Sequence, residues 1–147
     1  MSGDGAVKGC ACFRLRRTTR AITRLYDTYL LPAGVTVTQY SLLAKLSAAG
    51  PVTMRALADI MGMDRTSLTR TLAPLQAQGL VAIAPGADRR SRAIRLTEAG
   101  DALRQRCRPI WRAAQEDLQR RLGGDTLDRL QALLDQAFAR LQEDAPG

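Results

Sequence analysis

The most informative absence in this sequence is histidine, since none of the 147 residues is a histidine. Its absence excludes catalysis by Ser-His-Asp or similar arrangements and removes a common ligand of zinc sites. Lysine is nearly missing too, because Lys8 and Lys45 are the only two. Arginine therefore provides nearly all of the basic excess behind a formal net charge of +8. An excess of this kind predicts an acidic partner, either nucleic acid or a membrane surface.

Three further shortages narrow the class of protein. Aromatic residues make up only 4% of the sequence, so the core must come mainly from Leu, Ala, Val and Ile, within a hydrophobic content of 46%. No apolar run approaches the ~18 residues of a membrane span, and residues 1–9 lack an apolar secretion signal. We therefore expect a cytoplasmic protein without a membrane partner, whose three cysteines are reduced thiols. The length fits one domain or one subunit of an interlocked dimer.

The chain is organised around residues 54–96, where two short helical patterns meet at a turn. Thr53 can cap the first helix, Gly62 stands where a helix ends in a left-handed residue, and Asp64 can cap the second. Apolar residues recur at helical spacing in both, as Leu57, Ile60 and Met61 and then as Leu68, Leu72 and Leu75. This spacing predicts a helix-turn-helix, whose second helix enters the major groove of DNA.

The second helix opens with hydrogen-bond donors and small hydroxyls, which suit base edges and phosphates. These candidates are Arg65, Thr66, Ser67, Thr69 and Arg70. A hairpin over residues 80–96 follows, and its basic tip suits the negative potential of a narrow minor groove. The tip carries Arg89, Arg90 and Arg92, beside Asp88, whose carboxylate can orient the neighbouring arginines. Together with the net charge, these features predict double-stranded DNA as a partner.

These segments resemble the MarR family of winged-helix transcriptional regulators. The resemblance is carried by LADIMGMDRTSLTRTLAPLQAQGLV, by Asp88-Arg89-Arg90 and by LTEAG at residues 96–100, and it covers roughly residues 12–141. One departure is Ser91, which stands where the family pattern has a second acid. The resemblance implies a mainly α fold with a small β-hairpin wing, in which the N- and C-terminal helices form a dimerisation region.

The resemblance also implies how the chain is divided. The winged helix-turn-helix would span residues 36–97, and residues 10–34 and 98–147 would interlock with a second copy, after a disordered tail at residues 1–9. Such a homodimer presents two recognition helices to a pseudo-palindromic operator with half-sites about 34 Å apart. The implied function is a regulator, most simply a repressor, which a chemical signal releases from DNA.

The cysteines are candidates for sensing that signal. Cys10 and Cys12 start the first helix, and Cys107 lies between two arginines in a later one; a helix N-terminus and nearby cations favour the reactive thiolate form. Cys12 and Tyr26 also match the start of the organic-peroxide-sensing OhrR branch of the family, as its reactive cysteine and one of the tyrosines that hold it. Val37 stands where that branch has its second tyrosine.

Three interpretations of the thiols remain open. Cys12 could be oxidised and then form a disulfide with Cys10 or with Cys107 of the partner subunit. All three could together bind a soft ion such as arsenite, copper(I) or zinc. They could also be inert packing, in which case the effector would be a small aromatic or phenolic ligand, as is common in the family.

Two other classes of function are weaker alternatives. A thiol-dependent redox enzyme needs a base beside the nucleophile or a Cys-x-x-Cys pair, and the sequence has no histidine and no such pair; we therefore expect no enzymatic activity. A winged-helix module that contacts other proteins but not DNA would keep its dimer and show no salt-sensitive DNA binding.

Overall fold

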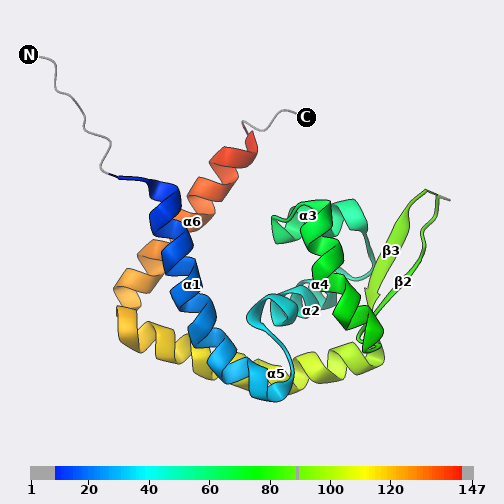
Figure 1. Ribbon diagram of the computed structural model, residues 1–147, viewed down its shortest axis with the longest axis horizontal. Helices are drawn as coiled ribbons and strands as arrows, with labels where there is room; N and C mark the ends of the chain where they lie inside the picture. The colour runs from blue at the N-terminus through cyan, green and yellow to red at the C-terminus, as the bar shows by residue number, and fades with distance from the viewer. Residues whose placement is uncertain (1–8, 89, 144–147) are drawn as a thin grey trace, which may run out of the picture.

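The structure, a computed structural model, describes residues 9–88 and 90–143 (Figure 1). Residues 1–8 of the predicted tail, and Arg89 of the predicted wing tip, lie outside the described residues. The helices are α1 (Ala11–Leu30), the short 3₁₀ helix η1 (Leu31–Ala33), α2 (Val37–Ala49), α3 (Met54–Met61), α4 (Arg65–Ala77), α5 (Glu98–Leu122) and α6 (Gly124–Glu143). The strands are β1 (Val52–Thr53), β2 (Val81–Pro85) and β3 (Arg92–Leu96). This confirms the predicted mainly helical fold with a small β wing.

Four of the helices begin at a side-chain cap, which accepts a hydrogen bond from a backbone N–H of the first turn. The capping oxygens belong to Thr36, Thr53, Asp64 and Thr97, at 3.0–3.3 Å from the N–H groups of Gln39, Ala56, Ser67 and Gly100. The sequence predicted two of these starts, at Thr53 and Asp64, because caps are local signals. α6 begins at Gly124, with Asp125 inside its first turn.

The wing is part of a three-stranded antiparallel sheet with the strand order β1-β3-β2. The hairpin of β2 and β3 was predicted, but β1 was not. β1 pairs with β3 through Val52 opposite Ile94 and Thr53 opposite Ala93. A strand of two residues is too short to show an alternating pattern, so only the fold reveals it. Its effect is to fasten the base of the wing to the start of α3.

Two groups of elements lie on either side of the molecule, and α5 runs between them (Figure 1). On one side, α2, α3, α4 and the sheet share a core of leucines with Ile94, to which α5 adds Leu103 and Cys107. On the other side, α1 and α6 pack on the second half of α5, where Ala114 and Leu118 are buried with Tyr26 and Leu127. α5 is continuous through Pro109, so one helix belongs to both cores.

No helix in the described ranges is both long and apolar enough to span a membrane.

Candidate DNA-binding surface

The turn between α3 and α4 fixes which face of α4 points outward. Gly62 ends α3 in the left-handed region, at φ +62°, which a residue without Cβ adopts at no steric cost. The N–H of Met63 then donates to the carbonyl of Ala58 at 2.9 Å. α4 buries one stripe against the core, formed by Leu68, Leu72 and Leu75. Its opposite face is consequently free for a ligand.

The five predicted residues Arg65, Thr66, Ser67, Thr69 and Arg70 are all exposed, at the N-terminal end of α4. The Thr69 hydroxyl donates to the carbonyl of Arg65 at 2.9 Å, which leaves its lone pairs able to accept a hydrogen bond. Hydrogen bonds from Ser67 lower the pKa of Asp64, so the capping carboxylate stays ionised at neutral pH. The structure thus places the predicted donors together at the N-terminal end of α4.

A cavity of about 500 Å³ lies between α3, the first residue of α4 and the wing. It is lined by four arginines and one acid, namely Arg55, Arg65, Arg90, Arg92 and Asp59, beside smaller side chains. Two of these arginines come from the wing and one from α4, so the structure brings the two predicted basic segments to one place. Four guanidinium groups against one carboxylate give this cavity an excess of positive charge, which favours anions.

Sequence reasoning missed Arg55, which comes from the first turn of α3. Its only signal was an exposed arginine at the start of the first helix of a helix-turn-helix, a helix that crosses the DNA backbone. That signal is weak because an arginine at such a position is usually just solvated. The fold makes Arg55 a stronger candidate for a phosphate contact, because it places Arg55 in the same cavity as Arg65, Arg90 and Arg92.

Within the part of the chain that the structure describes, the arginines of this surface form no ion pair with an acid. Among residues 9–88 and 90–143, the ion pairs within 4.0 Å involve Arg104, Arg120, Arg121 and Arg129. An ion pair of Arg65 or Arg70 with Asp64 or Asp59 would give these arginines a structural role. No such pair occurs among the described residues. Their positive charge therefore stays available to an anionic partner.

The wing tip is closed by hydrogen bonds centred on Asp88 and Ser91. The carbonyl of Asp88 accepts from the N–H of Ser91 and from its hydroxyl, both at 3.0 Å, and the N–H of Gly86 donates to the carbonyl of Ser91 at 2.8 Å. The Asp88 carboxylate accepts from the backbone N–H of Arg90 at 3.4 Å. Ser91 thus closes the tip with a neutral hydroxyl where the family pattern has an acid, which preserves the positive charge around Arg90.

The three cysteines do not come together within the chain. Cys10 and Cys12 are exposed at the start of α1, whereas Cys107 is fully buried in the core beneath α2. Burial raises the pKa of the Cys107 thiol and outweighs the opposing charge of Arg106, contrary to the expectation that its arginine neighbours favour the thiolate. Among the cysteine and acidic residues that the structure describes, no group of three lies close enough together to hold a metal ion.

Tyr26 also lies away from the thiols of its own chain. It is buried, and its hydroxyl donates to the side chain of Gln115 on α5. Fourteen residues separate it from Cys12 on the same helix, which at 1.5 Å per residue is about 21 Å. Within one chain Tyr26 therefore joins α1 to α5 and does not hold the Cys12 thiol.

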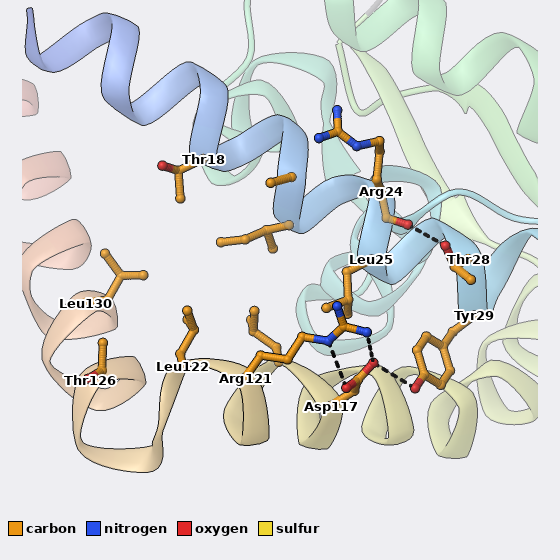
Figure 2. A pocket seen from close by; sticks show the side chains of 13 residues that line it. Thr18, Arg24, Leu25, Thr28, Tyr29, Asp117, Arg121, Leu122, Thr126 and Leu130 are labelled. Carbon is orange, nitrogen blue, oxygen red and sulfur yellow. Dashed lines mark hydrogen bonds and ion pairs between the residues drawn. The ribbon is translucent and has the colours of Figure 1, made fainter.

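A groove of about 540 Å³ lies between α1, α5 and α6 (Figure 2). Figure 2 shows Asp117 at its base, where the carboxylate accepts from the Tyr29 hydroxyl at 3.0 Å and from the Arg121 guanidinium at 3.1 and 3.3 Å. Its walls are mainly apolar and include Leu25, Leu122 and Leu130. The helices around it also carry most of the exposed large apolar residues, namely Phe13, Leu15, Leu122, Leu133, Leu134, Phe138 and Leu141.

The chain is similar to known transcriptional regulators of the MarR family. A model of the MarR family matches residues 33–91. The multiple antibiotic resistance protein MarR of Salmonella typhimurium is 33% identical over 114 residues, which span 76% of this chain and 78% of that protein. A crystal structure of the M. tuberculosis transcriptional regulator MosR in complex with DNA has a TM-score of 0.82 and 36% identity, covering 92% of this chain and 98% of that one. For a mutant Escherichia coli MarR in complex with operator DNA, the TM-score is 0.76 and the identity 26%, covering 84% and 89%.

Proposed function

The chain belongs to the MarR family of transcriptional regulators, and from this premise we propose that it is a dimeric repressor that dissociates from DNA when the thiols of Cys12 and Cys10 are oxidised. The observation that carries the DNA-binding part is the cavity between α4 and the wing, where four arginines face one acid. The similarity to MosR and MarR, both crystallised with DNA, supports the same assignment.

In the proposed complex, the N-terminal end of α4 enters the major groove and the wing tip follows the adjacent minor groove. Arg65, Thr66, Ser67, Thr69 and Arg70 are the proposed contacts from α4, and Arg89, Arg90 and Arg92 are those from the wing. Arg55 joins them as a phosphate contact. Asp88 shapes the wing tip without touching DNA.

A second copy of the chain is the proposed occupant of the groove between α1, α5 and α6. The exposed apolar side chains beside this groove, Leu15 and Leu122 among them, would cost free energy if they stayed in water. Leu133 and Phe138, further along α6, lie outside the proposed interface, and Phe138 packs on Gly62. Burying them against the same face of a second copy gives a two-fold dimer, which presents two α4 helices to a pseudo-palindromic operator. A signal that changes the packing of these helices changes the spacing of the two α4 helices and weakens binding.

The proposed signal is oxidation of Cys12 followed by disulfide formation with Cys10. The Cys12 thiolate takes the terminal oxygen of an organic hydroperoxide, the O–O bond breaks, and after return of the proton the products are a sulfenic acid and an alcohol. The Cys10 thiol then attacks the sulfenic sulfur, which forms a disulfide and releases water. The carbonyl of Cys10 accepts the first hydrogen bond of α1, from the N–H of Arg14 at 3.2 Å, so the new covalent bond would strain that turn.

Because Cys107 is buried, we interpret its thiol as inert packing, whereas Cys10 and Cys12 are exposed. A soft ion held by all three thiols would need the buried Cys107 to become accessible. Binding of arsenite is therefore the alternative signal that the experiment must distinguish from oxidation. A thiol peroxidase would need turnover with a reductant, which we do not expect in a chain without a histidine base.

Fluorescence anisotropy on DNA from upstream of the protein's own gene tests this proposal. Reduced protein should bind that DNA tightly at one fixed salt concentration, and an organic hydroperoxide should release it. The Cys12→Ser variant should bind equally well and resist the peroxide, while Cys107→Ser should still respond. If arsenite releases the protein and peroxide does not, soft-ion sensing replaces oxidation. If the DNA complex ignores both reagents, the signal is a small aromatic ligand, and no preference over unrelated DNA would contradict the repressor assignment itself.

A further inference from the structure

One aromatic side chain joins the end of α6 to the turn of the helix-turn-helix. A Cβ built on Gly62 would lie only 3.3 Å from Cε2 of Phe138, so the ring rests directly on the glycine. Phe138 is 49% exposed, compared with 61% for Leu133 on the same helix. The turn therefore covers part of the ring, even though residues 131–143 are all exposed.

Phe138 belongs to an apolar stripe along α6, which continues to Leu141. The stripe repeats every three or four residues, as Leu127, Leu130, Leu134 and Phe138. Leu127 is buried with Tyr26 and Leu118 on the dimerisation side. Eleven residues later, about 16 Å along the helix, Phe138 contacts the α3–α4 turn. Figure 1 shows the corresponding course of α6, which runs back from the end of α5 towards α3.

The position of that turn determines the position of the recognition helix. Only Met63 and Asp64 separate Gly62 from Arg65, the first residue of α4. Gly62 has no side chain and a positive φ of +62°, which is why an aromatic ring can approach its backbone so closely. α5 and α6 thus make two separate connections between the dimerisation helices and the DNA-binding elements, and the second one ends at the recognition helix.

We propose that Phe138 is a positioning residue for DNA binding. By resting on Gly62, it holds α4 at a set distance from the dimerisation helices and so determines which spacing of half-sites the dimer accepts. This proposal rests on the proposed function, namely a two-fold dimer on a pseudo-palindromic operator. Phe138 itself touches no DNA in this scheme.

The test compares operators that differ only in half-site spacing. The wild-type protein first selects its operator from random-sequence duplexes, and variants of that operator then gain or lose one central base pair, a shift of about 3.4 Å. Binding of Phe138→Ala is compared with that of the wild type and of Leu133→Ala, a matched loss of an exposed apolar side chain off the stripe. Sedimentation at the same concentrations measures the dimer, and the salt dependence of binding measures the phosphate contacts.

Phe138→Ala should lower the preference for the native spacing, on the order of fivefold, with an unchanged dimer and an unchanged salt slope. Leu133→Ala should keep the wild-type preference, and Phe138→Leu should restore most of it. An unchanged spacing preference in Phe138→Ala, or a loss that accompanies dissociation of the dimer, would overturn the proposal. A wild-type protein that is monomeric or selects no operator would overturn the proposed function as well, and this outcome is visible before any variant is made.

Discussion

Gly100 shows how one residue can decide a contact between elements. It lies buried in the first turn of α5. A Cβ at this position would overlap the carbonyl oxygen of Leu80 and approach Cδ1 of Leu96 to 2.7 Å. The neighbouring Thr97 hydroxyl donates to the carbonyl of Gly79 at 2.6 Å. The start of α5 is therefore held tightly against the segment that links α4 to the wing.

Gly100→Ala tests this close approach, because two effects oppose each other. Alanine is favoured over glycine inside a helix by about 1 kcal/mol, whereas overpacking a filled site costs about 1–3 kcal/mol. We expect overpacking to dominate, since a backbone carbonyl cannot move aside like a side chain, and the free energy of unfolding in urea should fall by about 1–2 kcal/mol. Gly124→Ala is the control, because its Cβ would meet only the flexible end of Gln119. Equal stability of the two variants would contradict the explanation.

Arg90 of the wing is a proposed phosphate contact whose individual contribution to DNA binding can be measured. Arg90→Ala should remove one phosphate contact, weaken binding to all sequences alike by about tenfold at low salt and reduce the slope of log affinity against log salt by about one. The matched control is Arg129→Ala, an exposed arginine of α6 that pairs with Asp125. Anisotropy titrations at several salt concentrations measure both. A sequence-dependent loss at Arg90 would instead indicate a base contact.

At the scale of elements, α1 is attached to α5 by polar contacts as well as by packing. The hydroxyls of Tyr26 and Tyr29 donate to the side chains of Gln115 and Asp117. Hydrogen bonds from Arg121 and Tyr29 hold the pKa of Asp117 below its usual range. The ionised carboxylate therefore stabilises the packing of α1 on α5 at neutral pH.

The sign of this shift gives a pH dependence. A carboxyl whose pKa is lower in the folded state contributes stability above its unfolded pKa of about 3.9, and the contribution is lost as pH falls through the lower, folded value. Asp117→Asn should thus be less stable than the wild type from pH 7 down to about pH 4, and the difference should shrink at more acidic pH. Urea unfolding at pH 7, 4 and 3 measures it. A constant difference across this range would assign the loss to packing and not to charge.

At the scale of the whole molecule, the distribution of exposed side chains fits the proposed dimer. The exposed apolar side chains gather on α1 and α6, around the groove of Figure 2, while the basic surface lies on α4 and the wing. α5 runs between the two regions, with α6 in contact with the turn. The proposed dimer interface and the proposed DNA-binding surface are thus separate and connected by helices, so we expect a change in one to alter the other.

Leu15→Glu should separate the two surfaces experimentally. Placing a charge in the proposed dimer interface should raise the dissociation constant of the dimer on the order of 100-fold, since an unpaired buried charge costs several kcal/mol, and operator binding should fall with it. Leu31→Glu is the control, because Leu31 is similarly exposed (55% against 50% for Leu15) but belongs to η1 and not to the helices α1, α5 and α6 that surround the groove. Sedimentation and anisotropy measure both variants. If Leu15→Glu remains a dimer, α1 is not in the interface.

The sequence by itself determined the features that depend on neighbours along the chain. The caps at Thr53 and Asp64, the left-handed Gly62 and the leucine stripe of α4 were predicted because capping and helical periodicity act over three or four residues. The fold class followed from the resemblance to the MarR family that these segments carry. The roles of the DNA contacts, the thiols and the dimerisation helices remain predictions for the experiments above.

Only the tertiary structure decided which distant residues meet. It added β1 to the wing, brought Arg55 into the cavity with Arg65 and the wing arginines, and placed Phe138 on Gly62. It also buried Cys107, so that desolvation outweighs the neighbouring Arg106 that made this thiol look reactive in the sequence. The physical reason is common to all four. Burial and contact between distant segments depend on how whole helices pack, and a pattern of adjacent residues does not contain that information.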